Sequence, residues 1–566
     1  MKRNKLLSFV IILSFGLIIV SCDDLLEPQP HNYHDRSRIF KDAPFAEGLL
    51  LTAYSALPTS YSFDESATDD ATSNLTNSDI ARMATGEWSS KFNPQSVWNN
   101  AYEQLYYLNY FLYVVDDVEW SWEKEERREL FKNRFTGEAK ALRAWYNFEL
   151  LKRHGGLSSD GQALGFVIIK PEYTSGDDLE SLLVLPRDSY EDCIQFILKD
   201  IEDAISILPE EYKNVANNSE YNLVNGEQNK NRINGKIVKA LKARVLLHIA
   251  SQDFYTASNK WEDAANAAAV LLSQNNGISG LSPTGVKWYN NSADPDIIWR
   301  KNFEQSNSWE RDNFPPSLFG NGRINPSQNL VDAFPMANGY PITNPQSGYD
   351  PNAPYSNRDP RLNSYIIYDG SQIGNRVIHT NVEGGIDGMN NLVNSTRSGY
   401  YLKKLLRESV NLDPTINTNA EHFYTYFRYT EMYLNFAEAA NEAWGPNSDP
   451  KGYGFTAKSV MEALRKRAGI IQPDNYLNSV SSTKDQFRDL IRNERRIELC
   501  FEGFRFWDIR RWNQEINSVV KGMLISNNTY TIVDVENRTF SPHMKYGPIP
   551  YEEVLKNSNL KQNAGW

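Results

Sequence analysis

The chain has 566 residues, a formal net charge of −12 and an aromatic content of 12%, with 13 Trp, 31 Tyr and 26 Phe. The acidic balance argues against nucleic acid or an anionic membrane surface as a partner. The length is ample for a large buried core, and abundant rings favour a ligand-handling protein, although many rings will belong to that core.

The N-terminus reads as a bacterial lipoprotein signal. A positively charged start precedes an apolar run over residues 6–20, which is too short for a comfortable membrane span. Ile19–Cys22 then fits a lipobox, in which a small serine admits the signal peptidase and the thiol of Cys22 takes the lipid. The alternative is an ordinary signal peptide with an incidental cysteine. We predict that residues 1–21 are removed and that several acyl chains on Cys22 anchor the protein.

Apolar residues then recur at helical spacing in several segments. Two pairs of these segments carry alanines at the contact positions, and they resemble the helix pairs of tetratricopeptide repeats. Between them lie polar, Asn-, Gly- and Pro-rich stretches, where function usually resides. The predicted helices are 98–115, 135–151, 190–208, 238–249, 261–272, 429–440 and 457–468, and the irregular stretches are 59–100, 214–231, 274–330 and 337–420.

No stretch reads as a linker between domains, so the sequence predicts a single domain after the signal. Its expected parts are an N-terminal tether (22–45), a helical scaffold with an N-terminal loop region (46–275), a loop-rich insertion region (276–425) and C-terminal helical and closing segments (426–566).

Residues 492–512 combine six arginines, four acidic residues and five bulky aromatic residues. Charges placed between rings are expected to be partly buried and therefore paired. Thr483 and Gln486 predict a capping box at the start of the preceding helix, and Gly503 predicts its C-terminal cap. We interpret the block as an architectural clamp, with a ligand site as the alternative.

The sequence offers no signal for catalysis or for a cofactor. After lipidation only Cys193 and Cys500 remain, and we expect both to be buried small hydrophobic residues rather than a redox pair. We find no Cys/His cluster with zinc spacing, no nucleophile elbow, no HExxH motif and no P-loop. We therefore predict a protein without catalytic residues, metal or cofactor.

An ordered set of segments resembles the SusD/RagB family, the surface nutrient-binding lipoproteins of Bacteroidetes. The resemblance runs from about residue 22 to the last residue. Cys500 stands where the family usually has a small residue, Phe504 where it often has His or Lys, and Ala564 where it has Pro. The segments that carry the resemblance are 137–156, 325–334, 357–362, 428–442, 465–469, 492–512 and 547–566.

The resemblance implies a mainly α fold, a tetratricopeptide-like helical-repeat scaffold with large irregular loop insertions. It also implies a lipid-anchored, surface-exposed outer-membrane protein, and the two acids after Cys22 resemble a surface-export signal. Such a protein binds an oligo- or polysaccharide and delivers it to a SusC-like TonB-dependent transporter. Peptide binding, as in RagB-like relatives, is the alternative function.

Sugar binding needs a flat ring that stacks on the C–H face and planar polar groups that meet the hydroxyls. The loops supply both, although each ring has a rival role in the core. Trp88 leads the candidates because it lies in a polar loop outside any helical stripe, whereas Trp98, Trp145, Trp261, Trp507 and Trp512 are expected to be structural. The predicted ligand contacts are Trp88, Asp70, Asp69, Trp309, Trp288, Tyr289, Arg397 and Tyr400, with Tyr401 beside them.

Overall fold

The structure, a computed structural model, describes residues 42–175 and 184–566. Cys22 and the predicted signal lie outside the described residues. The fold is mainly helical, which confirms the predicted fold class. In the part of the chain that the structure describes, no helix is both long and apolar enough to cross a membrane.

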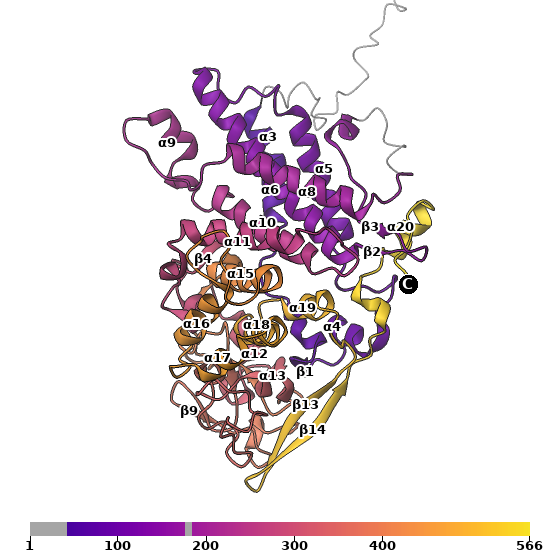
Figure 1. The fold of residues 1–566 in the computed structure, drawn as a ribbon. Helices are drawn as coiled ribbons and strands as arrows, with labels where there is room; N and C mark the ends of the chain where they lie inside the picture. Colours follow the sequence, from indigo (N-terminus) through magenta and orange to yellow (C-terminus); the bar gives the residue numbers. More distant parts are fainter. Residues whose placement is uncertain (1–41, 176–183) are drawn as a thin grey trace, which may run out of the picture.

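The helical part of the molecule fills the upper half of Figure 1, and the shorter elements of the insertion lie below it. Each predicted helix is present, and all but α6 (Glu125–His154) end within a few residues of their expected bounds. The helices are α3 (Ala43–Ser55), α4 (Asp79–Arg82), α5 (Trp98–Val114), α6 (Glu125–His154), α8 (Tyr190–Ile207), α9 (Ser219–Asn225), α10 (Gly235–Ala250), α11 (Lys260–Gln274), α12 (Ser308–Asn313), α13 (Gln328–Ala333), α14 (Pro360–Tyr365), α15 (Tyr429–Trp444), α16 (Ala457–Arg467), α17 (Asn475–Val480), α18 (Lys484–Glu498), α19 (Arg505–Arg511) and α20 (Tyr551–Lys556).

Local signals explain where several helices begin. Ser189 caps α8 by accepting a hydrogen bond from the backbone N–H of Asp192, at 3.0 Å. Thr456 and Ser459 form a capping box at the start of α16. Only α6 is much longer than expected. Its first ten residues are charged and largely exposed, so they carry no apolar repeat that periodicity could detect.

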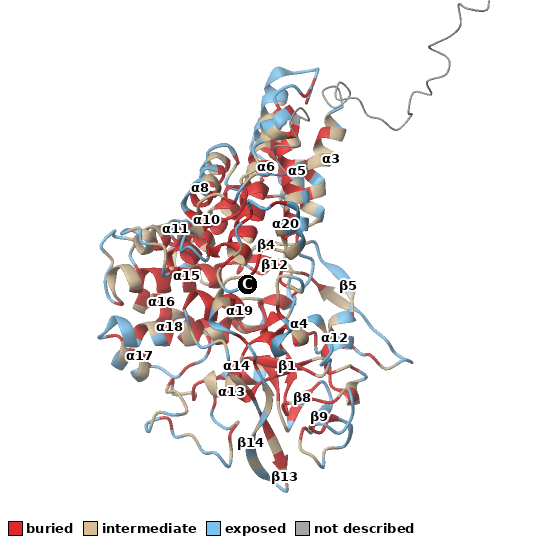
Figure 2. Ribbon diagram, turned by 90° about the vertical axis from the view of Figure 1, so that its right-hand side faces the viewer, coloured by how far each residue is buried: buried red, intermediate tan, exposed pale blue. Residues whose placement is uncertain are grey.

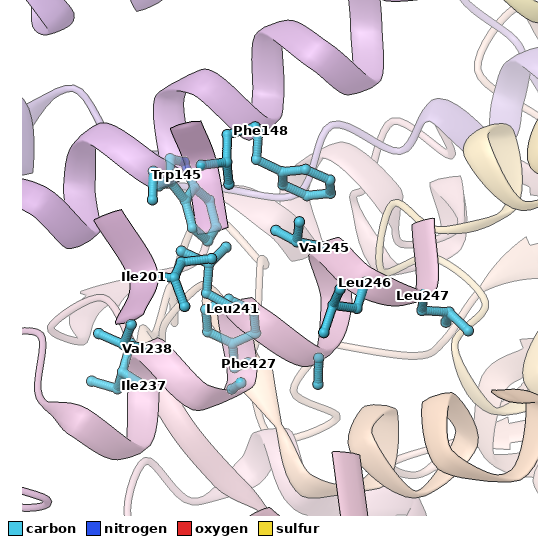
Figure 3. Packing of buried hydrophobic residues seen from close by; sticks show 14 of the residues in the cluster. Trp145, Phe148, Ile201, Ile237, Val238, Leu241, Val245, Leu246, Leu247 and Phe427 are labelled. Atoms are coloured by element: carbon cyan, nitrogen blue, oxygen red, sulfur yellow. The ribbon is translucent and has the colours of Figure 1, made fainter. Parts of the chain in front are cut away.

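Successive helices pack on one another to form the scaffold: α3 on α5, α5 on α6, α6 on α8, α8 on α10, α10 on α11, and α11 on α15. Alanines at the contacts let α11 and α15 approach closely, since Ala265 and Ala440 are fully buried. Figure 3 shows the centre of this core, where Trp145 of α6, Ile201 of α8 and Leu241 of α10 pack together.

The strands form antiparallel pairs rather than a large sheet. The long β13–β14 hairpin turns at Asn527 and Asn528, which both have positive φ as a two-residue hairpin turn requires, and it extends from the lower end of the molecule (Figures 1 and 2). The pairs are β1 (Ala71–Ser73) with β6 (Ile324–Pro326), β2 (Gly156–Leu157) with β3 (Ala163–Leu164), β4 (Ile297–Arg300) with β12 (Thr425–Arg428), β5 (Glu304–Ser306) with β11 (Ala420–His422), β7 (Ile366–Ile367) with β10 (Tyr401–Leu402), β8 (Ser371–Ile373) with β9 (Arg376–Ile378), and β13 (Val519–Ser526) with β14 (Thr529–Asn537).

Most charges of the block 492–512 are buried and paired, as predicted, although Arg510 is buried with backbone carbonyls as its acceptors. Arg495 of the block donates to Asp508, and Glu494 and Glu498 accept from the fully buried Arg361. The pairs join the insertion to α18 and α19, which is what a clamp requires. Cys193 and Cys500 are free and buried, which confirms their predicted role.

Two predicted caps of α18 are wrong. The Thr483 hydroxyl contacts the Gln486 side chain at 3.0 Å and makes no side-chain cap bond to the helix backbone. The helix ends at Glu498, so Gly503, with φ of 82°, serves the turn into α19 instead.

Candidate functional site

The sequence predicted that Trp88 lies on a polar surface, but the structure buries it. Its side chain is 3% exposed and packs edge-on against Phe540 and Trp566, while its indole N–H donates to Asn93 at 2.9 Å. A covered ring offers no face to a sugar. The polar composition of the loop therefore could not indicate that Trp88 is buried, because the rings that cover it come from distant parts of the chain.

Three further predicted contacts are buried, in two separate clusters. Trp288 is fully buried beneath the guanidinium of Arg428, and Tyr289 packs beside it edge-on. Tyr400 is also fully buried, and its hydroxyl donates to Gln328 at 2.5 Å. Tyr401, in another cluster, is buried as well. The predicted aromatic rim is therefore not assembled from these residues.

The predicted polar contacts are engaged in ion pairs. Asp70 is fully buried and accepts from Arg496 at 2.6 Å, and Asp69 accepts from Arg496 and Arg505 at 2.8 and 2.9 Å. Arg397 is half-buried and donates to Glu536. The aspartate bonds fasten the loop before β1 to α18 and α19, and the Arg397 bond fastens residue 397 to β14.

Trp309 alone among the predicted rings keeps accessible surface, because it is only half-buried. It packs edge-on against Tyr61, with 5.6 Å between ring centroids, and lies 4.7 Å from the ring of His422. Its remaining surface leaves it available at the edge of a site.

The buried carboxyl of Glu65 predicts a pH-dependent stability. Burial raises the pKa of Glu65 to about 8, although backbone N–H groups, including that of Gly503 at 2.8 Å, donate to the carboxyl and offset part of the effect. The folded state therefore holds a proton that the unfolded chain releases above its ordinary pKa. The free energy of unfolding should fall as pH rises from about 4.5 to about 8, by about 1.4 kcal/mol per pH unit for this group.

Glu65→Gln should flatten that slope, because the amide stays neutral at every pH. Urea unfolding between pH 5 and pH 9, compared with the exposed control Glu202→Gln, measures the difference. Equal slopes in wild type and Glu65→Gln would contradict the assignment.

The insertion presents a different aromatic residue to solvent. Phe319 is 49% exposed and has a φ of 64°, a left-handed conformation that is costly for a bulky side chain. It ends the short 3₁₀ turn Pro316–Leu318, and its backbone N–H donates to the Pro316 carbonyl at 2.9 Å. Strain of this kind is typically kept at functional positions.

Phe319 separates two adjacent surface hollows. The first, of about 400 Å³, lies between Phe319, the β8–β9 hairpin and residues 408–413. The second, of about 520 Å³, is also lined by Phe319 and lies toward residues 394 and 417. A third hollow, of about 480 Å³, shares Glu408 and Ser409 with the first. The three hollows adjoin one another through shared lining residues, and we call the set the insertion track.

Side-chain amides line the insertion track on both sides of the ring. Among the described residues, the amide groups of Asn321 and Asn375 make no intramolecular hydrogen bond, so they are free to meet a ligand. The first two hollows carry two cationic side chains and two carboxylates, which favours an uncharged ligand. The remaining amide and charged residues of these two hollows are Asn394, Asn411, Asn417, Arg311, Arg376, Glu408 and Asp413.

The scaffold fixes the position of the Phe319 turn. The Asn74 amide donates to the carbonyls of Asn321 and Gly322, at 2.8 and 2.9 Å. Pairing of β1 with β6 holds both segments in register. Because these hydrogen bonds and the strand pairing hold the turn in place, the exposed ring of Phe319 is pre-organised to stack on a ligand.

Phe319 lies in the predicted irregular stretch 274–330 but is not among the predicted ligand contacts. The sequence feature that could have indicated an exposed Phe319 is its position between Pro315–Pro316 and a Gly-Asn-Gly turn. A side chain between two tight turns is expected to project outward. The predicted ligand contacts include tryptophans instead, and most of these tryptophans lie in the core.

Comparisons with known proteins agree with this architecture. Residues 293–566 match the model of the SusD family, and residues 47–221 match a family described as "Starch-binding associating with outer membrane". A SusD-like protein of Formosa agariphila is 23% identical over 91% of this chain and 92% of its own length. A SusD-like protein of Bacteroides fragilis is 25% identical, with a TM-score of 0.73 over 94% of this chain and 99% of its own. A second B. fragilis structure, a SusD-like carbohydrate-binding protein, is 19% identical, with a TM-score of 0.69 over 92% and 99% of the two chains.

Proposed function

Because the chain belongs to the SusD/RagB family, we propose that it is a glycan-binding protein that captures an oligo- or polysaccharide along the insertion track. The observation that carries the proposal is Phe319. Its exposed, conformationally constrained ring stands between two hollows lined with amides. A ring can stack on the apolar face of a sugar while amides on either side meet its hydroxyls.

The form of the track supports a chain-like ligand. Three hollows joined through shared residues suit a row of sugar units better than one compact molecule. Trp309, which shares the insertion with the track, is a further candidate contact. The balance of charge in the two hollows beside Phe319 supports a neutral glycan.

We further propose that the protein is lipid-anchored in the outer membrane through Cys22 and faces the cell exterior. It would deliver its ligand to a SusC-like TonB-dependent transporter, binding the glycan without cleaving it. The lipobox sequence and the family support this part of the proposal.

Phe319→Ala tests the site. Loss of a central aromatic contact should weaken glycan binding by about 2 kcal/mol or more, which is about thirtyfold in Kd. The melting temperature should change little, because half of the ring is already exposed. Native gel electrophoresis through soluble starch, laminarin, xylan, mannan or pectin identifies a binding polysaccharide, and calorimetry with its oligosaccharides measures the affinity.

Phe303→Ala is the matched control, because Phe303 is equally exposed at 49% and lines none of the three hollows. Equal loss of affinity in both variants would count against a specific role for Phe319. Peptide capture, the alternative function, predicts no retardation by any polysaccharide and binding of a tryptic digest.

A further inference from the structure

The three hollows of the insertion track adjoin one another in a fixed order. The second and first hollows share Phe319 and Leu412, and the first and third share Glu408 and Ser409. Among the described residues, the second and third hollows have no lining residue in common. The first hollow is therefore the middle one, and a ligand that reaches both ends of the track must pass through it.

Each hollow contains an asparagine whose side-chain amide makes no hydrogen bond within the described part of the chain. Asn321 lies in the second hollow, Asn375 in the first and Asn290 in the third. The exposed hydroxyl of Ser409, where the first and third hollows meet, is likewise unbonded among the described residues. Amides and hydroxyls donate and accept hydrogen bonds, as the hydroxyl groups of a sugar do. The same kind of polar contact therefore recurs along the whole track.

The charges of the third hollow balance, as those of the other two do. Its cationic side chains are Lys287 and Arg407, and its carboxylates are Glu408 and Glu421. Lys287 also pairs with Glu408 at 3.7 Å. An uncharged ligand therefore suits the third hollow as well as the first two.

Exposed side chains stand at both ends of the track. They are Lys287 and Asn290 at the third hollow, and Pro414 and Asn417 at the second. A pocket that recognises the end of a chain has a buried wall against which the terminal unit stops. Because solvent lies beyond these exposed residues, a polymer chain can continue past either end of the track.

We propose that the insertion track holds an internal segment of a linear, neutral polysaccharide with a regular repeat, with successive sugar units in all three hollows. This inference rests on glycan capture along the track and adds the kind of glycan that the track selects. A regular polymer presents the same hydroxyl groups in each unit, which matches one unbonded asparagine amide in each hollow. Units of one chain that occupy adjacent hollows reinforce one another through their high effective concentration, so affinity grows with chain length.

A length series tests the proposal on the wild-type protein. The probes are malto-, laminari-, xylo- and manno-oligosaccharides, from disaccharides to decasaccharides, and calorimetry measures the Kd of each. In the series that binds, Kd should fall by about fivefold for each hydrogen bond gained, and it should level off once all three hollows are occupied. A bulky label at the reducing end should leave the Kd of the longest oligosaccharide unchanged, because the track holds internal units.

Asn290→Ala separates the third hollow from the other two. It should bind the shortest oligosaccharides as the wild type does and the longest about fivefold more weakly. Asn375→Ala, in the middle hollow, should weaken binding at every length. Asn99→Ala is the matched control, because Asn99 is exposed, makes no side-chain hydrogen bond among the described residues and lines none of the three hollows. All three variants should keep the wild-type melting temperature.

A Kd that does not change from the trisaccharide upward would overturn this inference and leave glycan capture in place. Equal losses in Asn290→Ala at every length, or no loss at any length, would do the same, because the third hollow would then not be a subsite for the far end of a chain. Loss of binding on labelling the reducing end would show that the track recognises a chain end. If the wild type bound none of the oligosaccharides and none of the polysaccharides, glycan capture itself would fail, and this inference with it.

Discussion

Trp88→Ala should lower the free energy of unfolding by about 3–5 kcal/mol, the cost of truncating a buried large aromatic residue. The ring fills a pocket between Phe506, Phe540 and Trp566, and the Arg510 guanidinium lies 5.3 Å from its centroid. Its removal would leave a cavity in a cluster that joins the N-terminal loop to the C-terminus. Urea unfolding followed by circular dichroism measures the change.

Glycan affinity per folded molecule should be unchanged in Trp88→Ala. This outcome is the opposite of the one expected for a sugar platform, which would lose binding and keep its melting temperature. Leu75→Ala provides a control, because Leu75 is 40% exposed and belongs to the same N-terminal loop region. If Trp88→Ala instead kept its normal stability and lost glycan binding, Trp88 would be assigned to the ligand site.

Arg361→Ala should destabilise the protein by about 3–5 kcal/mol, because it leaves buried carboxylates without their cation. Arg361 is fully buried and donates to Asp359, Glu494 and Glu498, at distances between 2.5 and 3.1 Å. These bonds join α14 of the insertion to α18 of the clamp. Chemical unfolding of the variant gives the free-energy difference directly.

Arg82→Ala is the comparison for Arg361→Ala. Arg82 also pairs with a carboxylate, at 2.6 Å from Glu87, but its side chain is 41% exposed. Exposed pairs contribute about 1 kcal/mol or less, so this variant should unfold almost as the wild type does. Similar losses in both variants would show that burial does not set the strength of the Arg361 network.

Local patterns explain why the helices were predictable. The apolar stripe of α8 and the alanines of α11 repeat at helical spacing within a short window, and Ser189 and Thr456 add caps. The charged start of α6 has no apolar stripe, so periodicity could not predict that part of the helix. Pairing of most charges in 492–512 was also foreseeable, because burying a charge is costly unless the charge is paired and hydrogen-bonded.

The ligand contacts were not predictable by the same reasoning. Polar surroundings suggested that Trp88 and Asp70 were exposed, yet Trp88 is covered by rings 418, 452 and 478 residues later in the chain (Phe506, Phe540 and Trp566), and Asp70 is neutralised by Arg496. Exposure depends on what packs against a side chain, and loops acquire their neighbours only when the chain has folded.

The sequence by itself determined the helical class, the family and the paired clamp, because each rests on local periodicity or on the ordered spacing of motifs. Only the tertiary structure decided which rings reach solvent. It buried Trp88 and Trp288, left Phe319 between two hollows, and placed Asn321, Asn375 and Asn290 in the successive hollows of the insertion track. The physical reason is that burial and charge compensation are properties of contacts between distant segments, and those contacts are absent from any short window of sequence.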